Sequence, residues 1–155
     1  MSENARVFDA NNPADFTDAC KIAQRYMPKQ QYQCVLMLLN GEEGGFFKEK
    51  LCEIATTITA MTRYGGESDR PIEPIAQLHY FGPGYDGYVC ALSDEPDEDE
   101  EVLEAYGLAR FDHFGGDGSI GYLSIAEYKT TRFMELDFHW QPKTFDEIRR
   151  DFHNA

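Results

Sequence analysis

The sequence predicts an α+β fold in which helices precede an antiparallel sheet of four or five strands and a last helix closes the chain. The first sixty-odd residues carry apolar side chains at helical spacing, whereas residues 75–140 hold short aromatic-rich segments separated by turns. Segregated helices and strands with local connections are typical of this class. A length of 155 residues fits one domain, 1–155, with a helical part at about 12–64, a sheet part at about 75–140 and a closing helix at about 144–153.

Three helices are expected in the first part. Asn12 is a candidate N-cap for a helix that starts at Pro13, and apolar residues follow at helical spacing until Pro28 stops it. The next run, QYQCVLMLL, fits a buried strand or a helix, and its Leu, Met and Gln content favours a helix. The segment at 44–64 predicts the third helix, and the glycine pair that follows it is a terminator.

Strands are expected after the Gly- and Pro-rich connector. The five candidate segments cover residues 75–81, 87–93, 104–111, 120–128 and 132–140. FGPGYDG and FGGDGS are typical of hairpin loops, and the alternation in MELDFHW indicates a half-buried strand. Ser124 with Glu127, and Thr144 with Glu147, have the spacing of capping boxes, so a short helix and the closing helix are expected to begin there.

The composition is strongly acidic and excludes several functions. Asp and Glu number 28 against 14 Lys and Arg, which gives a net charge of −14. Nucleic-acid binding needs a positive surface and anionic membranes repel this charge, so we expect neither direct nucleic-acid binding nor membrane binding. The sequence holds no phosphate loop, Gly-x-Ser-x-Gly or His-Glu-x-x-His motif. A non-enzymatic role without a cofactor is therefore favoured.

The cysteines and the first residues indicate a cytoplasmic protein. Cys20, Cys34, Cys52 and Cys90 form no Cys-x-x-Cys pair and lie in apolar surroundings, so we expect buried, reduced thiols. The polar start MSENARVFDANN is unlike a signal peptide, and no apolar run approaches the length of about 20 residues that spans a bilayer.

Residues 71–148 resemble a known family. The series LHYF, a glycine turn, GLARF, GYLSI and LDFHWQP resembles the strand and turn pattern of small plasmid- and phage-encoded proteins of unknown function. The resemblance implies a fold and a mobile-element origin, which would place the protein in the cytoplasm of a host cell, but it implies no catalytic residues. Asp86-Gly87-Tyr88 stands where these proteins have Asp-Trp-Tyr, and an acidic block replaces their short turn after the second strand.

The acidic block is the most distinctive feature. Its acidic residues are Asp94, Glu95, Asp97, Glu98, Asp99, Glu100, Glu101 and Glu104, with no basic residue between them. An EF-hand loop would need a Gly at position 6 and a Glu at position 12, where this chain has Asp99 and Ala105. A solvated hairpin loop and a surface that imitates the charge of nucleic acid both remain open. In the second case, nearby aromatic residues such as Tyr85 and Tyr88 would help to bind the partner.

The sheet offers a second candidate site. His79 lies in the first predicted strand, and Asp137 and His139 lie on one side of the last. If these strands are neighbours, the three side chains could bind a metal ion or carry out acid–base chemistry, although the same pattern describes an ordinary polar face.

The favoured hypothesis is a non-enzymatic protein of a phage or plasmid. It would bind a host protein that has a basic nucleic-acid-binding surface and so inhibit host defence, as anti-restriction and anti-CRISPR proteins do. The alternatives are a small-molecule or metal-dependent activity on the polar face of the sheet, and an accessory module without activity of its own.

Overall fold

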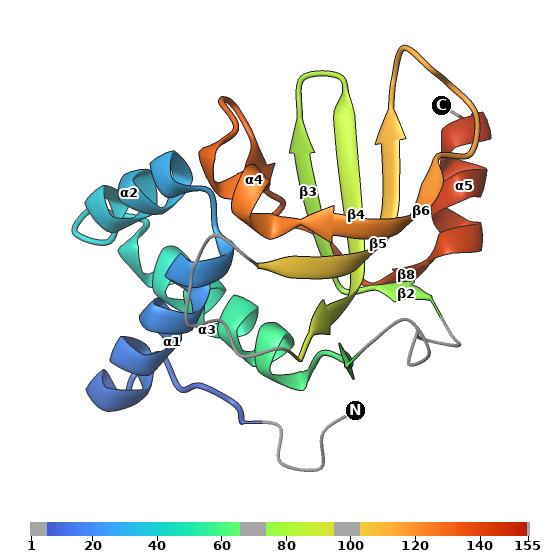
Figure 1. Cartoon of the computed structure of the whole chain (residues 1–155). Helices are drawn as coiled ribbons and strands as arrows, with labels where there is room; N and C mark the ends of the chain where they lie inside the picture. Colours follow the sequence, from blue (N-terminus) through green and yellow to red (C-terminus); the bar gives the residue numbers. More distant parts are fainter. Residues whose placement is uncertain (1–5, 66–73, 95–102, 155) are drawn as a thin grey trace. The chain divides into compact units, whose positions relative to one another are not determined.

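The computed structural model describes residues 6–65, 74–94 and 103–154 (Figure 1). Five helices and an antiparallel sheet confirm the α+β class and the helices-first order. The chain divides into two compact units, Met1–Met61 and Thr62–Ala155, and each has its own hydrophobic cluster. The boundary falls where the sequence changes from helical to strand periodicity.

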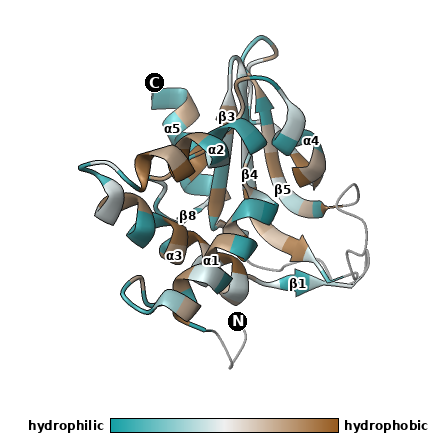
Figure 2. Ribbon diagram, turned by 90° about the vertical axis from the view of Figure 1, so that its left-hand side faces the viewer, coloured by the Kyte–Doolittle hydropathy of each residue, from teal (hydrophilic) through white to brown (hydrophobic). Residues whose placement is uncertain are grey.

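The first unit holds the three predicted helices: α1 (Pro13–Tyr26), α2 (Lys29–Leu38) and α3 (Gly44–Ala60). Asn12 caps α1 as expected, because its Oδ1 accepts a hydrogen bond from the Asp15 amide at 3.1 Å. Small residues of α1 and α3, Ala19 and Ala55, are fully buried in one cluster with Phe8 and Cys52. Figure 2 shows hydrophobic and hydrophilic residues mixed along α3, as an amphipathic helix requires.

The end of the third helix differs from the prediction. The helix stops at Ala60, and Arg63–Tyr64 form strand β1, which pairs in parallel with Leu92 and Ser93. The Tyr64 side chain is 3% exposed. The burial of this large ring in the core of the second unit outweighs the helical pattern of its neighbours, which extends to Met61.

The second unit is built around one sheet. Its main strands are β3 (Leu78–Gly82), β4 (Tyr85–Ser93), β5 (Glu104–Phe111), β6 (Ser119–Ser124) and β7 (Glu135–Leu136), in the order β6-β5-β4-β3-β7. All these neighbours are antiparallel, as the hairpin signals predict. A separate small sheet pairs β2 (Ile75–Ala76) with β8 (Lys143–Thr144).

Both predicted capping boxes begin helices of this unit. Ser124 caps α4 (Ile125–Thr130) by accepting from the Glu127 amide at 3.1 Å. Thr144 precedes α5 (Phe145–Asn154) and exchanges hydrogen bonds with Glu147 in both directions. No helix among the described residues is both long and apolar enough to cross a membrane.

The last predicted strand is much shorter than its alternating pattern suggests. Only Glu135 and Leu136 pair with β3, and residues 138–139 form a turn. Phe133 has a φ of +65°, which turns the chain just before the strand. The alternation still places Met134 and Leu136 in the core, although the strand geometry does not continue to Trp140.

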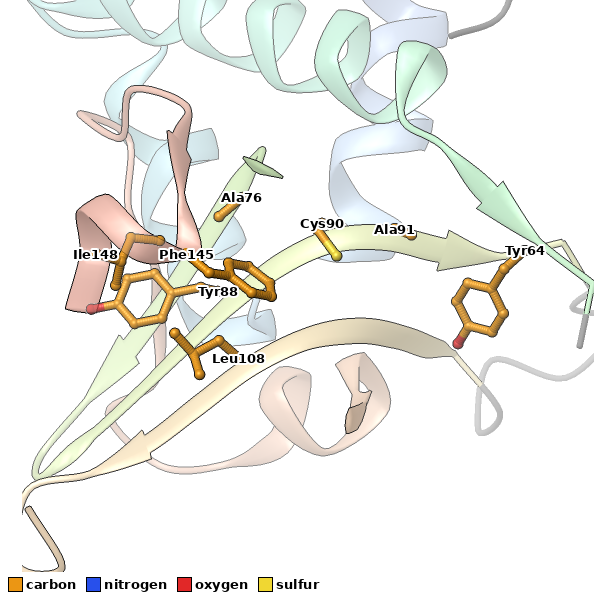
Figure 3. Close-up of a cluster of buried hydrophobic side chains, with 8 residues drawn as sticks. All are labelled: Tyr64, Ala76, Tyr88, Cys90, Ala91, Leu108, Phe145 and Ile148. Carbon is orange, nitrogen blue, oxygen red and sulfur yellow. The ribbon is translucent and has the colours of Figure 1, made fainter. Parts of the chain in front are cut away.

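The core of this unit lies between the sheet and α5. Tyr88 lies among Leu108, Phe145 and Ile148, and Tyr64 marks the other end of the same cluster (Figure 3). The backbones of β4 and β5 approach closely at a β-bulge, where a Cβ on Gly107 would lie 1.9 Å from the Tyr88 carbonyl oxygen. Only glycine fits there.

Candidate functional site

The acidic block joins two neighbouring strands, β4 and β5, as the hairpin prediction requires. Residues 95–102, with six of its carboxylates, lie outside the described residues. Its two ends are described, and Tyr64 holds them both. The Tyr64 carbonyl accepts a hydrogen bond from the Asp94 amide at 2.9 Å, and the Tyr64 hydroxyl donates one to Glu104 Oε1 at 2.8 Å. The two ends of the acidic block are therefore fixed to one buried residue.

Aromatic rings surround this anchor. Tyr64, Tyr106 and Tyr122 contact one another, with ring centroids 5.6–6.3 Å apart. Tyr106 and Tyr122 are paired across β5 and β6, and the Tyr122 side chain is 42% exposed. We call Tyr64, Asp94, Glu104, Tyr106 and Tyr122 the stem cluster. It combines exposed carboxylates with an exposed ring, a combination that suits cationic side chains.

Tyr85 and Tyr88 do not join the stem cluster. Tyr85 begins β4, nine residues before Asp94, so the two lie roughly 30 Å apart along the strand. Tyr88 is 6% exposed and packs in the core, where burial raises the pKa of its hydroxyl. Neither tyrosine belongs to the contacts around Asp94 and Glu104, the two described ends of the acidic block, and a shared role of the tyrosines and the block stays a prediction.

His79 meets one of its two predicted companions. Strands β3 and β7 are neighbours, and His79 Nδ1 lies 2.9 Å from Asp137 Oδ2. The other ring nitrogen, Nε2, lies 2.7 Å from Asp86 Oδ1. The His79 ring therefore lies between two carboxyl groups, one at each of its nitrogens. We call these three residues the histidine clamp.

Aromatic rings enclose the histidine clamp. The His79 ring stacks on Tyr88 with centroids 4.6 Å apart and planes 4° from parallel, and Phe81 and Trp140 lie within 5.6 Å. The His79 side chain is only 12% exposed. An Asp–His pair can serve as a general base when the second nitrogen faces a substrate, but here Asp86 occupies that nitrogen. The arrangement joins β3, β4 and β7 rather than presenting a reactive atom.

His139 contacts the clamp through its backbone. It is exposed in a turn, and its backbone amide donates to Asp137 Oδ1 at 2.9 Å. Across the described ranges, no three His, Cys, Asp or Glu side chains are arranged to hold a metal ion. The third predicted member therefore supports the orientation of Asp137 through its backbone.

Two residues of these sites escaped sequence reasoning. Asp86 lies at the start of β4, opposite Phe81 of β3. No sequence pattern marks it as a site residue, and only the register of the hairpin shows that it lies near His79. Tyr64 looked like the last residue of a helix. A pairing of 63–64 with the end of β4 cannot be read from so short a segment, because two residues show no periodicity.

The cysteines are all free thiols, as predicted, but they are not all buried. Cys52 and Cys90 are buried, Cys20 is half-buried and Cys34 is exposed on α2. Burial raises the pKa of Cys90 to about 11, so this thiol is a poor nucleophile. The prediction that Cys34 is buried was wrong. Its neighbours in the sequence are apolar, but Cys34 lies on the exposed face of α2.

No protein-family model, curated protein or solved structure matches this chain.

Proposed function

We propose that the protein is a non-enzymatic binding protein whose acidic block engages a basic, normally nucleic-acid-binding surface of another protein. The observation that carries the proposal is the attachment of both ends of the block to Tyr64. Carboxylates presented from fixed ends lose less freedom on binding than carboxylates on an untethered tail. A dense row of negative charge can then compete with a phosphate backbone for the same cationic groove.

The stem cluster supports a cationic partner independently of the charge count. Tyr122 exposes its ring next to Tyr64, and the Tyr64 hydroxyl holds the Glu104 carboxylate. An arginine of the partner can stack on the ring while its guanidinium pairs with a carboxylate. The resemblance to plasmid and phage proteins favours nucleases and effector complexes of host defence as the partners.

The first experiment separates charge position from total charge. One variant changes the eight acidic residues of the block to Asn or Gln. A control variant neutralises eight exposed acidic residues elsewhere, so that both lose the same charge: Glu42, Glu43, Glu49, Glu53, Asp112, Glu135, Asp146 and Asp151. Binding to an arginine-rich peptide is measured by calorimetry at low and at high salt. Wild type and control should bind at least about tenfold more tightly than the block variant at low salt, and the difference should shrink at high salt. Equal affinity of the two variants would contradict the proposal.

The second experiment tests the class of partner. DNA cleavage by a type I restriction endonuclease and by a Cas9–guide RNA complex is assayed with each of the three proteins. Inhibition by wild type and control, and its loss in the block variant, is the expected result. If wild type inhibits neither enzyme although it binds the peptide, the host-defence assignment is wrong while the binding site stands.

A further inference from the structure

A groove lies at the opposite end of the sheet from the stem cluster. Its volume is about 390 Å³, within the range of pockets that take small ligands or side chains. Among the described residues, those that line it include Tyr85, Phe111, Glu127, Tyr128, Arg132 and Met134. We call this the aromatic groove.

The walls of the groove are rings set at steep angles. Tyr85 contacts Phe111 with centroids 4.9 Å apart and planes 61° from parallel, and it contacts Tyr128 at 5.7 Å and 53°. The Phe111 side chain is 44% exposed, so a ligand in the groove can contact its ring. Inclined ring walls of this kind accept a further aromatic ring in edge-to-face contact, and the Met134 thioether adds a polarisable surface.

Polar groups in the groove favour a ligand that carries charge of both signs. The Tyr85 and Tyr128 hydroxyls form a hydrogen bond with each other. This bond uses one of the two hydroxyl hydrogens, so the pair can also donate one hydrogen bond to another group. Glu127 and Arg132 supply one negative and one positive charge. A ligand whose ring has one cationic and one anionic neighbour complements this charge pair.

The backbone beside the groove is in an uncommon conformation. Phe133, between the groove residues Arg132 and Met134, has a φ of +65°, which is costly for a bulky side chain. Its ring is 62% exposed, and the Arg132 guanidinium lies 4.9 Å above its centroid. Burial in the described structure therefore does not explain why a phenylalanine occupies a position where glycine would be easier. We expect the contact of its ring with the Arg132 guanidinium to help position this charge beside the groove.

We propose that the aromatic groove binds an aromatic side chain, of the tyrosine type, from a peptide segment whose neighbouring residues are oppositely charged. The ring enters between Tyr85, Phe111 and Met134, while the flanking charges pair with Glu127 and Arg132. The exposed rings of Phe114 and Phe133 extend the apolar surface beyond the groove, which suits a peptide better than an isolated small molecule. This site is separate from the acidic block, and its occupation does not depend on the function proposed for that block.

The test uses the full chain and defined peptides. The probe is acetyl-Lys-Tyr-Asp-amide, and the comparison peptides replace Tyr by Leu, or both charged residues by Gly. Binding is followed by NMR titration of the Met134 methyl and of the backbone amides around Tyr128. We expect the probe to bind with at least about fivefold higher affinity than either comparison peptide. Equal binding of the Leu peptide would overturn the aromatic specificity, and absence of shifts with any peptide would overturn the site.

Matched variants locate the binding. Phe111→Ala and Ile120→Ala each remove a side chain that is 44% exposed. The first should weaken the probe about tenfold and the second should leave it unchanged; equal effects would overturn the proposal. The variant with a neutralised acidic block should bind the probe as wild type does, which keeps the two proposals distinguishable.

Phe133→Gly tests the explanation of the backbone conformation. This change relieves the positive φ and removes the ring under Arg132, so the thermal unfolding midpoint should stay or rise. Affinity should fall for the charged probe and change less for the uncharged Gly-Tyr-Gly peptide. A variant that loses stability but keeps full affinity would show that Phe133 serves the fold rather than the groove.

Discussion

Gly107 lies where the backbones of β4 and β5 leave no room for a side chain. A Cβ at this position would lie 1.9 Å from the Tyr88 carbonyl oxygen, which is part of the backbone and cannot rotate away. Its cross-strand partner in β6 is Gly121, where a Cβ would have no heavy atom within 4 Å. The two glycines therefore form a matched pair in which only one is sterically required.

We expect Gly107→Ala to lower the free energy of unfolding of the sheet unit by about 3 kcal/mol. Gly121→Ala should be neutral or slightly stabilising, because alanine restricts the unfolded chain more than glycine does. Urea unfolding followed by the fluorescence of Trp140, which is the single tryptophan, measures both. Similar effects of the two substitutions would show that β4 and β5 can separate at the bulge without cost.

At the scale of elements, the histidine clamp explains how so short a strand as β7 is held. Only two of its residues pair with β3, and the Asp137 amide adds one hydrogen bond to the His79 carbonyl at 2.8 Å. The side chains of His79 and Asp137 then tie the end of the strand to β3, and Asp86 extends the tie to β4. Trp140 closes this region by donating from its indole to the Ala76 carbonyl at 3.0 Å.

His79→Phe keeps the stacked ring but removes both ring nitrogens, so Asp86 and Asp137 lose their shared partner. We expect the free energy of unfolding to fall by about 2 kcal/mol. Hydrogen exchange at the Asp137 amide should accelerate by a larger factor than exchange at the Val89 amide in the central strand. His139→Phe, at an exposed position outside the clamp, is the control. If both variants resemble wild type, stacking alone holds β7.

The elements that the sequence predicts best are those with local signals. Asn12, Ser124 and Thr144 mark helix starts because a cap is a contact between residues three apart. The strand status of Arg63–Tyr64 and the early end of β7 depend on pairing with distant residues, which no local pattern records. The meeting of His79 with Asp137 followed from strand adjacency, whereas Asp86 required the register of the hairpin. The prediction of a single domain, and that of a cationic partner, stay predictions.

At the scale of the whole molecule, buried tyrosines and net charge act together at alkaline pH. Burial raises the pKa of Tyr85, Tyr88 and Tyr128 in the sheet unit, and that of Tyr32 in the helical unit to about 12. An unfolded tyrosine ionises near 10. Below that pH the hydroxyls are protonated in both states, so their contribution to stability is fully present. Above it the unfolded chain releases protons that the folded chain retains, and stability is lost as the pH rises toward the folded pKa values.

Each tyrosine that ionises also adds to a net charge that is already −14 at neutral pH, so repulsion favours the expanded chain further. We therefore expect a titration followed by absorbance at 295 nm to show fewer than the nine tyrosines ionising near pH 10. The remaining tyrosines should ionise together with the loss of circular dichroism at higher pH. In concentrated guanidinium chloride all nine should titrate in one step. A single step near pH 10 with unchanged circular dichroism in the native protein would contradict this prediction, because it would mean that these hydroxyls are hydrated in the folded chain.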